Sequence, residues 1–285
     1  MSLILPVLLD ALIDRALGED LLGDDITTDA CVAPDVRASA VAIARRPAVV
    51  CGSEVFRRVF SRVDPGISVD ELAQDGHSVR AGTHLWRASG SARSLLLAER
   101  TALNFVQRMS GIATLTHAYV DALPKGSGVR ITDTRKTTPG LRALERYAVR
   151  VGGGHNHRDN LGSAVLIKDN HIVAAGGISK AIARARERAP HTSRIEVEVA
   201  SVAELDEALA ARADIIMLDN FSLPDLRAAV DRARAVLSSV ILEVSGGVTL
   251  ENIPALAASG VDVISVGALT HSAPAADIAL DLTLQ

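Results

Sequence analysis

From about residue 129 onward, short runs rich in Val and Ile alternate with segments whose apolar residues recur at helical spacing. Strands that alternate with helices in this way predict a parallel sheet covered by helices. The six expected strands lie at 129–133, 164–168, 195–199, 215–219, 240–245 and 263–267. Because eight such units need roughly 200 residues or more, and these six occupy about 135, the spacing predicts an α/β barrel with fewer than eight strands.

The part of the chain before residue 115 has a different pattern. Short strand candidates with glycine turns precede an expected helix at about 94–109. We therefore expect a separate α+β domain over residues 1–113, followed by the barrel over 114–271. The segment 272–285 either continues the barrel or returns to pack on the first domain.

Composition excludes several classes of protein. Of the 285 residues, 48% are apolar, which is ample for a globular core, but only 2% are aromatic. No basic run is interleaved with aromatic residues, so we do not expect nucleic acid as a partner. Asp10 and Asp14 interrupt the apolar start of the chain, which predicts an amphipathic helix there and no membrane segment. Cys31 and Cys51 have neither zinc nor disulfide spacing, which favours a cytoplasmic location.

Positive charge is concentrated in residues 134–172. The chain has a net charge of −4, yet this stretch holds seven Lys or Arg, three His and only three acidic residues. Such a local excess indicates a site for an anion. Arg135 beside Lys136 suits a substrate with two carboxylates, although a solvated basic turn is the alternative. His157 and Arg158 end a glycine-rich run that does not fit a dinucleotide fingerprint, and the two histidines at 155 and 157 lack a third metal ligand.

Charged residues also stand on or just after the expected strands. Lys168 ends an apolar strand, where it would bind an anionic substrate, form a Schiff base or pair with Glu198 or Asp219. Glu196 and Glu198 alternate on one face of their strand and are expected to point into the barrel. Glu198 with Asp219 is a plausible oxygen pair for Mg²⁺ held through water, whereas Glu196 is expected to anchor a lysine or arginine.

The last two expected strands end in glycine-containing loops. Ser245, Gly246 and Gly247 follow one strand, and Gly267 follows the other. Backbone N–H groups of the final loops commonly hold phosphate in α/β barrels. These loops are therefore candidates for a phosphate site.

Long segments of the chain are similar to one known family. The matching stretches include "LLLAERTALNFVQRMSGIATLT", "DTRKTTPGLRALERYAVRVGGGHNHR", "LIKDNHI", "EVEV", "IMLDN", "EVSGGV" and "VGALTHS". Together they resemble the quinolinate phosphoribosyltransferase family of type II phosphoribosyltransferases. The resemblance implies an incomplete α/β barrel of about seven strands with an N-terminal α/β sandwich. It also implies a homodimer, or a hexamer, whose active sites lie at the subunit interface.

The resemblance further implies an activity: the transfer of a phosphoribosyl group from phosphoribosyl diphosphate to quinolinate with loss of CO₂, in de novo NAD biosynthesis. The residues implied to bind quinolinate are Arg100, Arg135, His157, Arg158 and Lys168. Those implied to bind phosphoribosyl diphosphate are Lys136, Glu198, Asp219, Ser245, Gly246, Gly247, Gly267 and His271. Within this second set Lys136, Glu198 and Asp219 would also be catalytic, and Glu198 with Asp219 would hold Mg²⁺.

Other functions stay open at this point. A family paralogue found beside molybdate-uptake proteins would act on a different acceptor, and a lyase would use Lys168 as a Schiff base. A noncatalytic phosphate-binding sensor is a further alternative. The chain departs from the family pattern at Asp159, Asn160 and Ser163, where we expect an effect on local helix packing and not on the substrate contacts.

Overall fold

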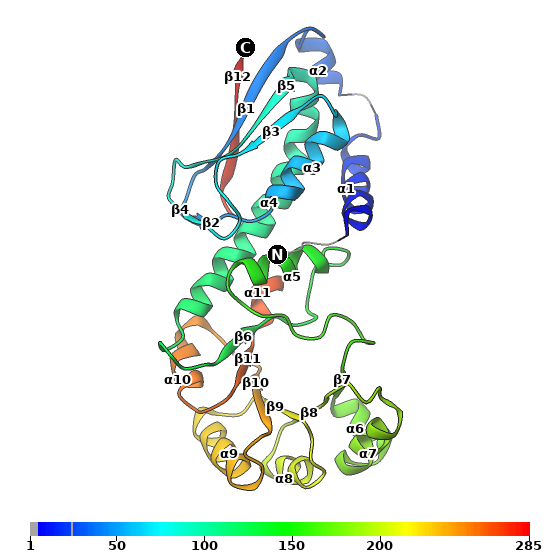
Figure 1. The fold of residues 1–285 in the computed structure, drawn as a ribbon, viewed down its shortest axis with the longest axis vertical. Helices are drawn as coiled ribbons and strands as arrows, with labels where there is room; N and C mark the ends of the chain where they lie inside the picture. The colour runs from blue at the N-terminus through cyan, green and yellow to red at the C-terminus, as the bar shows by residue number, and fades with distance from the viewer. Residues whose placement is uncertain (1–4, 24) are drawn as a thin grey trace. The chain divides into compact units, whose positions relative to one another are not determined.

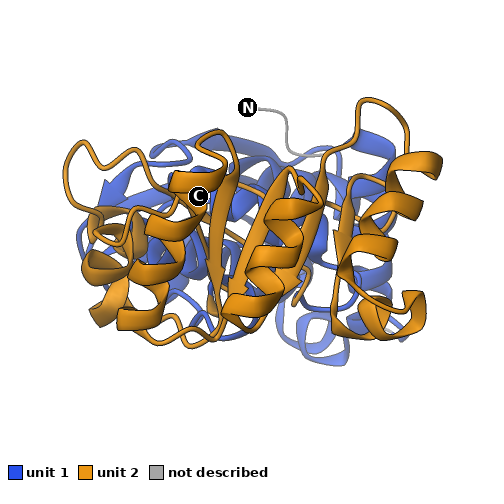
Figure 2. Cartoon of the chain, turned by 90° about the horizontal axis from the view of Figure 1, so that it is seen from below, with its two compact units in different colours: residues 1–117, 137–153, 269–285 blue, residues 118–136, 154–268 orange. Residues whose placement is uncertain are grey.

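The computed structural model describes residues 5–23 and 25–285, which form two compact units. The first unit contains the residues up to 117 together with 137–153 and 269–285, and the second contains 118–136 and 154–268. Figure 2 shows the two units in separate colours. This division differs from the single boundary expected at residue 113, because both units draw on more than one stretch of sequence. Within the described residues, no helix is both long and apolar enough to cross a membrane.

The second unit is built on a sheet of six parallel strands in the order β6-β11-β10-β9-β8-β7 (Figure 1). Each strand falls within one of the six segments expected from the sequence. The strands are β6 (Arg130–Thr132), β7 (Val165–Ile167), β8 (Ile195–Val199), β9 (Ile215–Asp219), β10 (Ile241–Ser245) and β11 (Val263–Ser265).

Helices connect these strands along the outside of the sheet. Two of them begin after a serine that caps the helix, since Ser201 accepts a hydrogen bond from the Glu204 N–H and Ser222 accepts one from the Asp225 N–H. The helices are α6 (Asp169–Ala175), α7 (Ile178–Arg188), α8 (Val202–Ala210), α9 (Leu223–Val236), the 3₁₀ helix η1 (Leu250–Asn252) and α10 (Ile253–Ala257).

The sheet of the second unit curves like a barrel but is not closed by hydrogen bonds. The edge strands β6 and β7 do not pair with each other. An isolated parallel bridge joins Thr132 of β6 to His155, so the expected seventh strand is reduced to a single bridge. The prediction of an incomplete α/β barrel is confirmed.

The first unit contains an antiparallel sheet in the order β12-β1-β5-β3 and a two-stranded sheet of β2 and β4. The segment after residue 271 returns to this unit, because β12 pairs with β1 from Ala38 opposite Leu284 to Ala44 opposite Ile278. The strands are β1 (Arg37–Ala44), β2 (Ala48–Val49), β3 (Ser68–Glu71), β4 (Ser78–Val79), β5 (His84–Ser91) and β12 (Ile278–Leu284).

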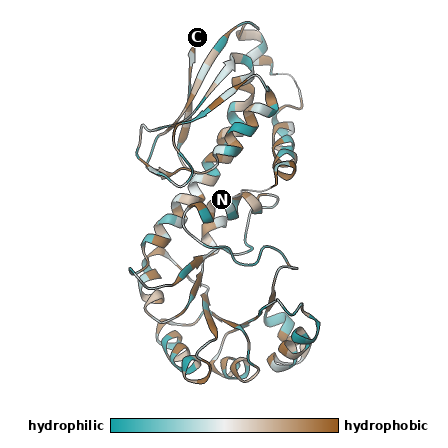
Figure 3. Ribbon diagram, viewed as in Figure 1, coloured by the Kyte–Doolittle hydropathy of each residue, from teal (hydrophilic) through white to brown (hydrophobic). Residues whose placement is uncertain are grey.

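Alternate residues of β1 are buried, so one face of this sheet forms part of a core, and Trp86 of β5 stacks on Phe56 of α3 at 4.9 Å between ring centres. Figure 3 shows hydrophobic and hydrophilic residues interspersed along these elements. The helices are α1 (Pro6–Asp20), α2 (Ile26–Cys31), α3 (Ser53–Val63), α4 (Ala92–Asp121) and α5 (Arg142–Val151), and the short α11 (Ala268–His271) follows β11.

The helix α1 is amphipathic over its described residues, as expected. It buries Leu9, Ile13 and Leu17, which are spaced four apart. The two aspartates that interrupt its apolar sequence form ion pairs with arginines of α3, Asp10 with Arg58 and Asp14 with Arg62. The expected residues 1–4 of this helix lie outside the described residues.

The helix α4 is longer than the sequence indicated, because Gly111 does not break it. A Cβ atom at Gly111 would lie 2.0 Å from the carbonyl oxygen of Pro274. The glycine therefore permits a close approach between α4 and the segment that leads to β12.

Candidate active site

A cavity of about 620 Å³ lies in the second unit at the C-terminal ends of the parallel strands. This is the end of a parallel sheet where the loops after the strands meet. Ten of the residues singled out from the sequence line it: Arg135, Lys136, His157, Arg158, Lys168, Glu198, Asp219, Ser245, Gly246 and Gly247.

Strand register explains why these residues meet. Asp219 and Ser245 are paired across β9 and β10, and both end their strands. Glu198 of β8 is paired with Met217 of β9, so it lies two residues deeper in the sheet than Asp219. Parallel strands in this register bring residues that are some twenty positions apart in sequence to the same rim.

His157 is held at the wall of the cavity by buried acidic groups. Its backbone N–H donates to Asp133 Oδ1 at 2.8 Å. Its ring nitrogen Nε2 lies 3.3 Å from Glu196 Oε2 and 3.5 Å from Glu243 Oε1. The side chains of the two glutamates are each 4% exposed, and that of His157 is 13% exposed. Glu196, which was expected to anchor a lysine or arginine, pairs with this histidine, and the charge of Arg158 also lowers its pKa.

The charge on His157 depends on these carboxylates. Burial by itself lowers the pKa of the imidazole, but the hydrogen bonds and charges of Glu196 and Glu243 outweigh it and raise the pKa to about 10. Burial raises the pKa of Glu196, and the neighbouring His157 acts in the opposite direction. These two carboxylates therefore favour the charged form of His157 at neutral pH.

Two arginines lie close together beside this histidine. Burial first, and then the positive charge of Arg135, lower the pKa of Arg158. The Arg158 guanidinium also donates to the Ala164 carbonyl oxygen at 3.2 Å. Two guanidinium groups near each other in a partly buried cavity repel, and a bound anion would relieve that repulsion.

The mouth of the cavity has a second group of charges. The Lys168 ammonium forms an ion pair with Glu198, which is one of the arrangements considered from the sequence. Burial and then the negative charge of Glu198 raise the pKa of Asp219. Because two carboxylates that repel each other across a partly exposed site are stabilised by a divalent cation, the donor set of Glu198 and Asp219 fits Mg²⁺.

The turn after β10 favours glycine at its centre. Gly246 has φ +88°, and a Cβ atom there would lie 2.1 Å from Asn220 Oδ1. The Asn220 side chain in turn donates to Asp219 Oδ2 at 2.8 Å, and its backbone N–H donates to the Ser245 carbonyl oxygen at 3.0 Å. The loops after β9 and β10 are thus fixed to each other by Asn220, a residue that the sequence analysis did not single out.

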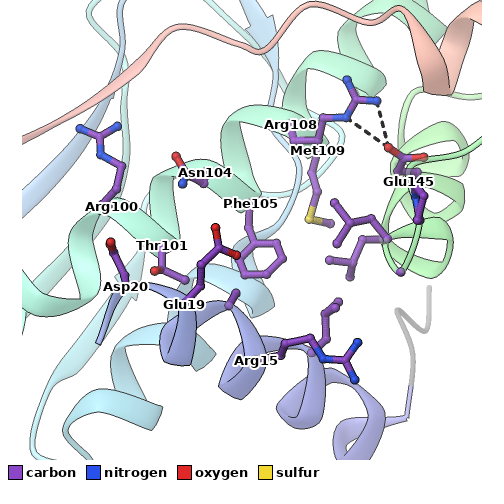
Figure 4. Close-up of a pocket in the computed structure, with 16 residues that line it drawn as sticks. Arg15, Glu19, Asp20, Arg100, Thr101, Asn104, Phe105, Arg108, Met109 and Glu145 are labelled. Carbon is purple, nitrogen blue, oxygen red and sulfur yellow. Dashed lines mark hydrogen bonds and ion pairs between the residues drawn. The ribbon is translucent and has the colours of Figure 1, made fainter. Parts of the chain in front are cut away.

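The remaining predicted site residues lie elsewhere. Gly267 follows β11 and is not among the lining residues, although Ser265 of the same strand is. Arg100 and His271 belong to the first unit. There Arg100 lines a separate cavity of about 430 Å³ with residues of α1 and α4 (Figure 4), and His271 Nδ1 lies 2.7 Å from Ser272 Oγ.

The cavity also has lining residues that sequence reasoning missed: Thr134, Leu166, Met217, Asn220 and Ser265. Of these, Met217 and Ser265 could have been predicted from the sequence. They lie on expected barrel strands, next to strands whose side chains were already expected to point into the barrel or to follow a strand end. Glu243, behind the wall, has the same alternation along β10 as Ser245.

The three departures from the family pattern form one polar turn. Ser163 Oγ accepts hydrogen bonds from the N–H groups of Asp159 and Asn160 at 3.0 and 3.2 Å, and Asn160 Oδ1 accepts one from the Gly162 N–H at 2.9 Å. This segment is a turn and not a helix. The expectation of altered helix packing is therefore wrong, since there is no helix here to alter.

The second unit is an incomplete α/β barrel with cationic side chains and a carboxylate pair at its strand ends. Together with the antiparallel sheet of the first unit, these features are typical of enzymes that bind anionic substrates. Comparison with known proteins makes the assignment specific. Sequence models of the N-terminal and C-terminal domains of quinolinate phosphoribosyl transferase match residues 25–110 and 112–281. The chain belongs to the quinolinate phosphoribosyl transferase family.

Several relatives resemble the chain over nearly its whole length. A nicotinate-nucleotide pyrophosphorylase (carboxylating) of Mycobacterium leprae is 47% identical over 273 residues, which cover 95% of each chain. The human protein of the same name is 40% identical over 97% of this chain and 92% of its own length. The crystal structure of NadC from Streptococcus pyogenes is 41% identical, covers 100% of both chains and superimposes with a TM-score of 0.94.

Proposed function

We propose that this protein transfers the phosphoribosyl group of phosphoribosyl diphosphate to quinolinate, with decarboxylation, to give nicotinate mononucleotide, CO₂ and pyrophosphate in NAD biosynthesis. One observation carries the proposal: the cavity at the strand ends is lined by cationic side chains and by a carboxylate pair. The first group, the cationic half of the site, suits a dicarboxylate, and the second, the acidic half, suits a metal-bound diphosphate. The names of the full-length relatives support the same activity.

The cationic half of the site would bind quinolinate. Arg135 and Arg158 are close enough for their charges to interact, and a guanidinium grips a carboxylate through two parallel hydrogen bonds. His157 adds a further positive charge at the wall, and Lys168 stands at the mouth. Two adjacent carboxylates on a pyridine ring would neutralise this cluster better than one, which favours a dicarboxylate over a monocarboxylate.

The acidic half would bind phosphoribosyl diphosphate. Glu198 and Asp219 would hold Mg²⁺, directly or through water, with Lys136 beside them. When bound, Mg²⁺ supplies positive charge that neutralises the leaving pyrophosphate. The turn at Ser245, Gly246 and Gly247 offers backbone N–H groups to the 5′-phosphate, and we assign Gly267 and His271 to the same part of the site by family resemblance.

The chemistry follows from these positions. As the bond from the ribose C1 to pyrophosphate breaks, positive charge develops on the ring, and the carboxylates of Glu198 and Asp219 stabilise it. The pyridine nitrogen attacks this carbon. The carboxylate next to the nitrogen is lost as CO₂, and the ring carbon that keeps the bonding electron pair takes up a proton from solvent. The protein's contribution is to orient the two substrates and to place fixed charges where charge develops.

The proposal extends to assembly and location. We propose a homodimer in which Arg100 of one subunit reaches the quinolinate of its partner, with a hexamer as a larger form. Arg100 is exposed in the single chain, which leaves it available for such a contact. The cytoplasmic location expected from the cysteine content stays a prediction.

The decisive test is product analysis. Purified protein is mixed with quinolinate, phosphoribosyl diphosphate and Mg²⁺, with nicotinate as the acceptor in a parallel reaction. We expect nicotinate mononucleotide from quinolinate only, with one CO₂ and one pyrophosphate per turnover, and no product when Mg²⁺ is chelated. Because Arg158 would make a charged hydrogen bond to the substrate, Arg158→Ala should lower kcat/KM for quinolinate by about 10- to 150-fold.

Other outcomes would select other functions. No product from well-folded protein would contradict the proposal and favour the paralogue with a different acceptor. Trapping of a carbonyl substrate on Lys168 by borohydride would instead indicate a Schiff-base lyase.

A further inference from the structure

Two glutamates lie behind the cavity wall without lining the cavity. Glu196 of β8 and Glu243 of β10 are both buried, whereas His157, which they flank, is part of the lining. A substrate in the cavity would therefore contact the histidine but not the glutamates. Ionised carboxylates are costly to bury unless a cation meets them. Both buried carboxylates lie at one place, directly behind His157, where the imidazole can offset the cost of their burial.

The ring of His157 is held at both of its nitrogens. Nε2 faces the two glutamates, and Nδ1 accepts a hydrogen bond from the backbone N–H of Arg158 at 2.7 Å. This contact describes the ring with its proton on Nε2. Taking up a second proton on Nδ1 requires the Arg158 contact to open, and the new N–H then needs an acceptor. A carboxylate of a bound substrate is such an acceptor.

A buried hydrogen-bond network fixes the glutamates in turn. The hydroxyl of Ser265, on β11, donates to Glu243 and lies 2.7 Å from the Thr132 hydroxyl of β6. Three strands besides that of Glu196 thus take part in holding the imidazole. The charged groups that face or adjoin His157 are Glu196 from β8, Glu243 from β10, Asp133 after β6 and Arg158 next in sequence.

We propose that Glu196 and Glu243 are positioning residues for the acceptor substrate: from behind the cavity wall they orient the His157 imidazole at Nε2 and supply the negative charge that keeps it cationic towards a carboxylate of the bound pyridine. This inference rests on the proposed function for the identity of the substrate. The charge of the histidine with this substrate bound, in contrast, can be tested without any turnover.

The first experiment measures the charge of His157 in the wild-type protein. Histidine ring nitrogens labelled with ¹⁵N report protonation, and the His157 signals are identified by their loss in His157→Asn. At pH 8 and with quinolinate bound, we expect an imidazolium in the wild type and a neutral ring in the double variant Glu196→Gln, Glu243→Gln. A neutral His157 in the quinolinate-bound wild type at pH 8 would overturn the proposal, whether or not any variant folds.

The second experiment separates positioning from general damage. Glu243→Gln keeps the shape of the side chain and removes its charge. We expect KM for quinolinate to rise by about 10- to 150-fold while kcat and KM for phosphoribosyl diphosphate stay unchanged, because the lost interaction is one of substrate binding. The matched control is Asp262→Asn, whose carboxylate pairs with Arg234 and accepts the N–H of Leu242, the residue before Glu243 in β10, at 2.7 Å. It should leave both KM values unchanged.

The outcomes distinguish three explanations. If both KM values rise together in Glu243→Gln, or if Asp262→Asn has the same effect, the glutamate is structural and the proposal is wrong. The atoms of His157, Glu196 and Glu243 lie within 4.8 Å of one another, so a metal ion would also fit. One equivalent of metal in the purified protein that is lost in Glu243→Gln would overturn the proposal in favour of a metal site. If the wild type makes no nicotinate mononucleotide, the proposed function fails, but the ¹⁵N measurement still decides the charge of His157.

Discussion

The two units each bury glutamates, but they satisfy them in different ways. In the first unit, Glu145 of α5 accepts hydrogen bonds from Arg108 at 2.9 Å and from the backbone and hydroxyl of Thr138 at 3.0 and 2.7 Å. In the second unit, Glu196 and Glu243 share one histidine. A carboxylate that accepts hydrogen bonds from an arginine and from neutral donors needs no ligand to balance its charge. A pair of carboxylates around one titratable ring holds charge that depends on pH and on a ligand.

The Glu145 group and the His157 group also differ in the parts of the molecule that they contact. Arg108 donates to the carbonyl oxygens of Ala273 and Thr270 besides Glu145, so this group ties α4 and α5 to the segment that leads to β12. His157, in contrast, borders a cavity. We therefore assign the Glu145 group to stability and the His157 group to binding, and three predictions test that assignment.

The largest effect is expected for Glu145→Ala. The substitution leaves Arg108 partly buried without its carboxylate and removes two further hydrogen bonds, so it should lower the free energy of unfolding by about 3–5 kcal/mol. Denaturant unfolding measures this loss. In the protein that remains folded, KM for quinolinate should be unchanged. An unaltered unfolding midpoint, or a raised KM with normal stability, would break the comparison.

A smaller, pH-dependent effect is expected around His157. Its pKa in the folded protein is about 10, above the ordinary value of about 6.5. A raised pKa contributes stability that is fully present below about pH 6.5 and is lost as the pH rises through about 10. Urea unfolding of the wild type between pH 6.5 and 10 should show this loss. In Glu196→Gln, Glu243→Gln the decline should be shallower, and an equally steep decline would assign it to other groups.

The smallest effect is expected where a carboxylate is exposed. Asp206 of α8 pairs with Arg232 of α9, with Nη2 and Oδ2 2.7 Å apart, and about half of each side chain is open to solvent. Water and salt screen such a pair. Asp206→Asn should leave the thermal unfolding midpoint unchanged at both low and high salt. A clear decrease at low salt would mean that exposure does not separate the two kinds of carboxylate.

The strands of the second unit were predictable because each is a short β-branched run bounded by turn residues. Lys168, Glu198, Asp219 and Ser245 could be placed at one rim for the same reason, since parallel strands end on the same side. The partner of Glu196 could not be predicted in this way. Glu196 and Glu243 lie on strands separated by β9, and only the curvature of the sheet brings both carboxylates to one ring.

The first unit was predictable only in outline. Its β1 and β5 are short alternating strands with turn residues beside them, as expected. Nothing in the residues between 137 and 153 indicates that they belong to a different unit from Lys136, because that depends on long-range packing such as the Gly152 approach to α4. A Cβ atom at Gly152 would lie 2.4 Å from the Ala113 carbonyl oxygen. The sequence shows the glycine that such a close contact requires, but it does not show which residue the glycine contacts.

The pairing of β12 with β1 has a consequence for synthesis. On the ribosome, residues 278–284 emerge after every strand of the parallel sheet, and they are the partners of residues 38–44. One side of β1 therefore lacks its neighbour during most of translation, and an unpaired strand edge is a site of aggregation. The parallel sheet can form as its strands emerge, while the first-made sheet is the last to be completed. Such long-range pairing is also slow to form.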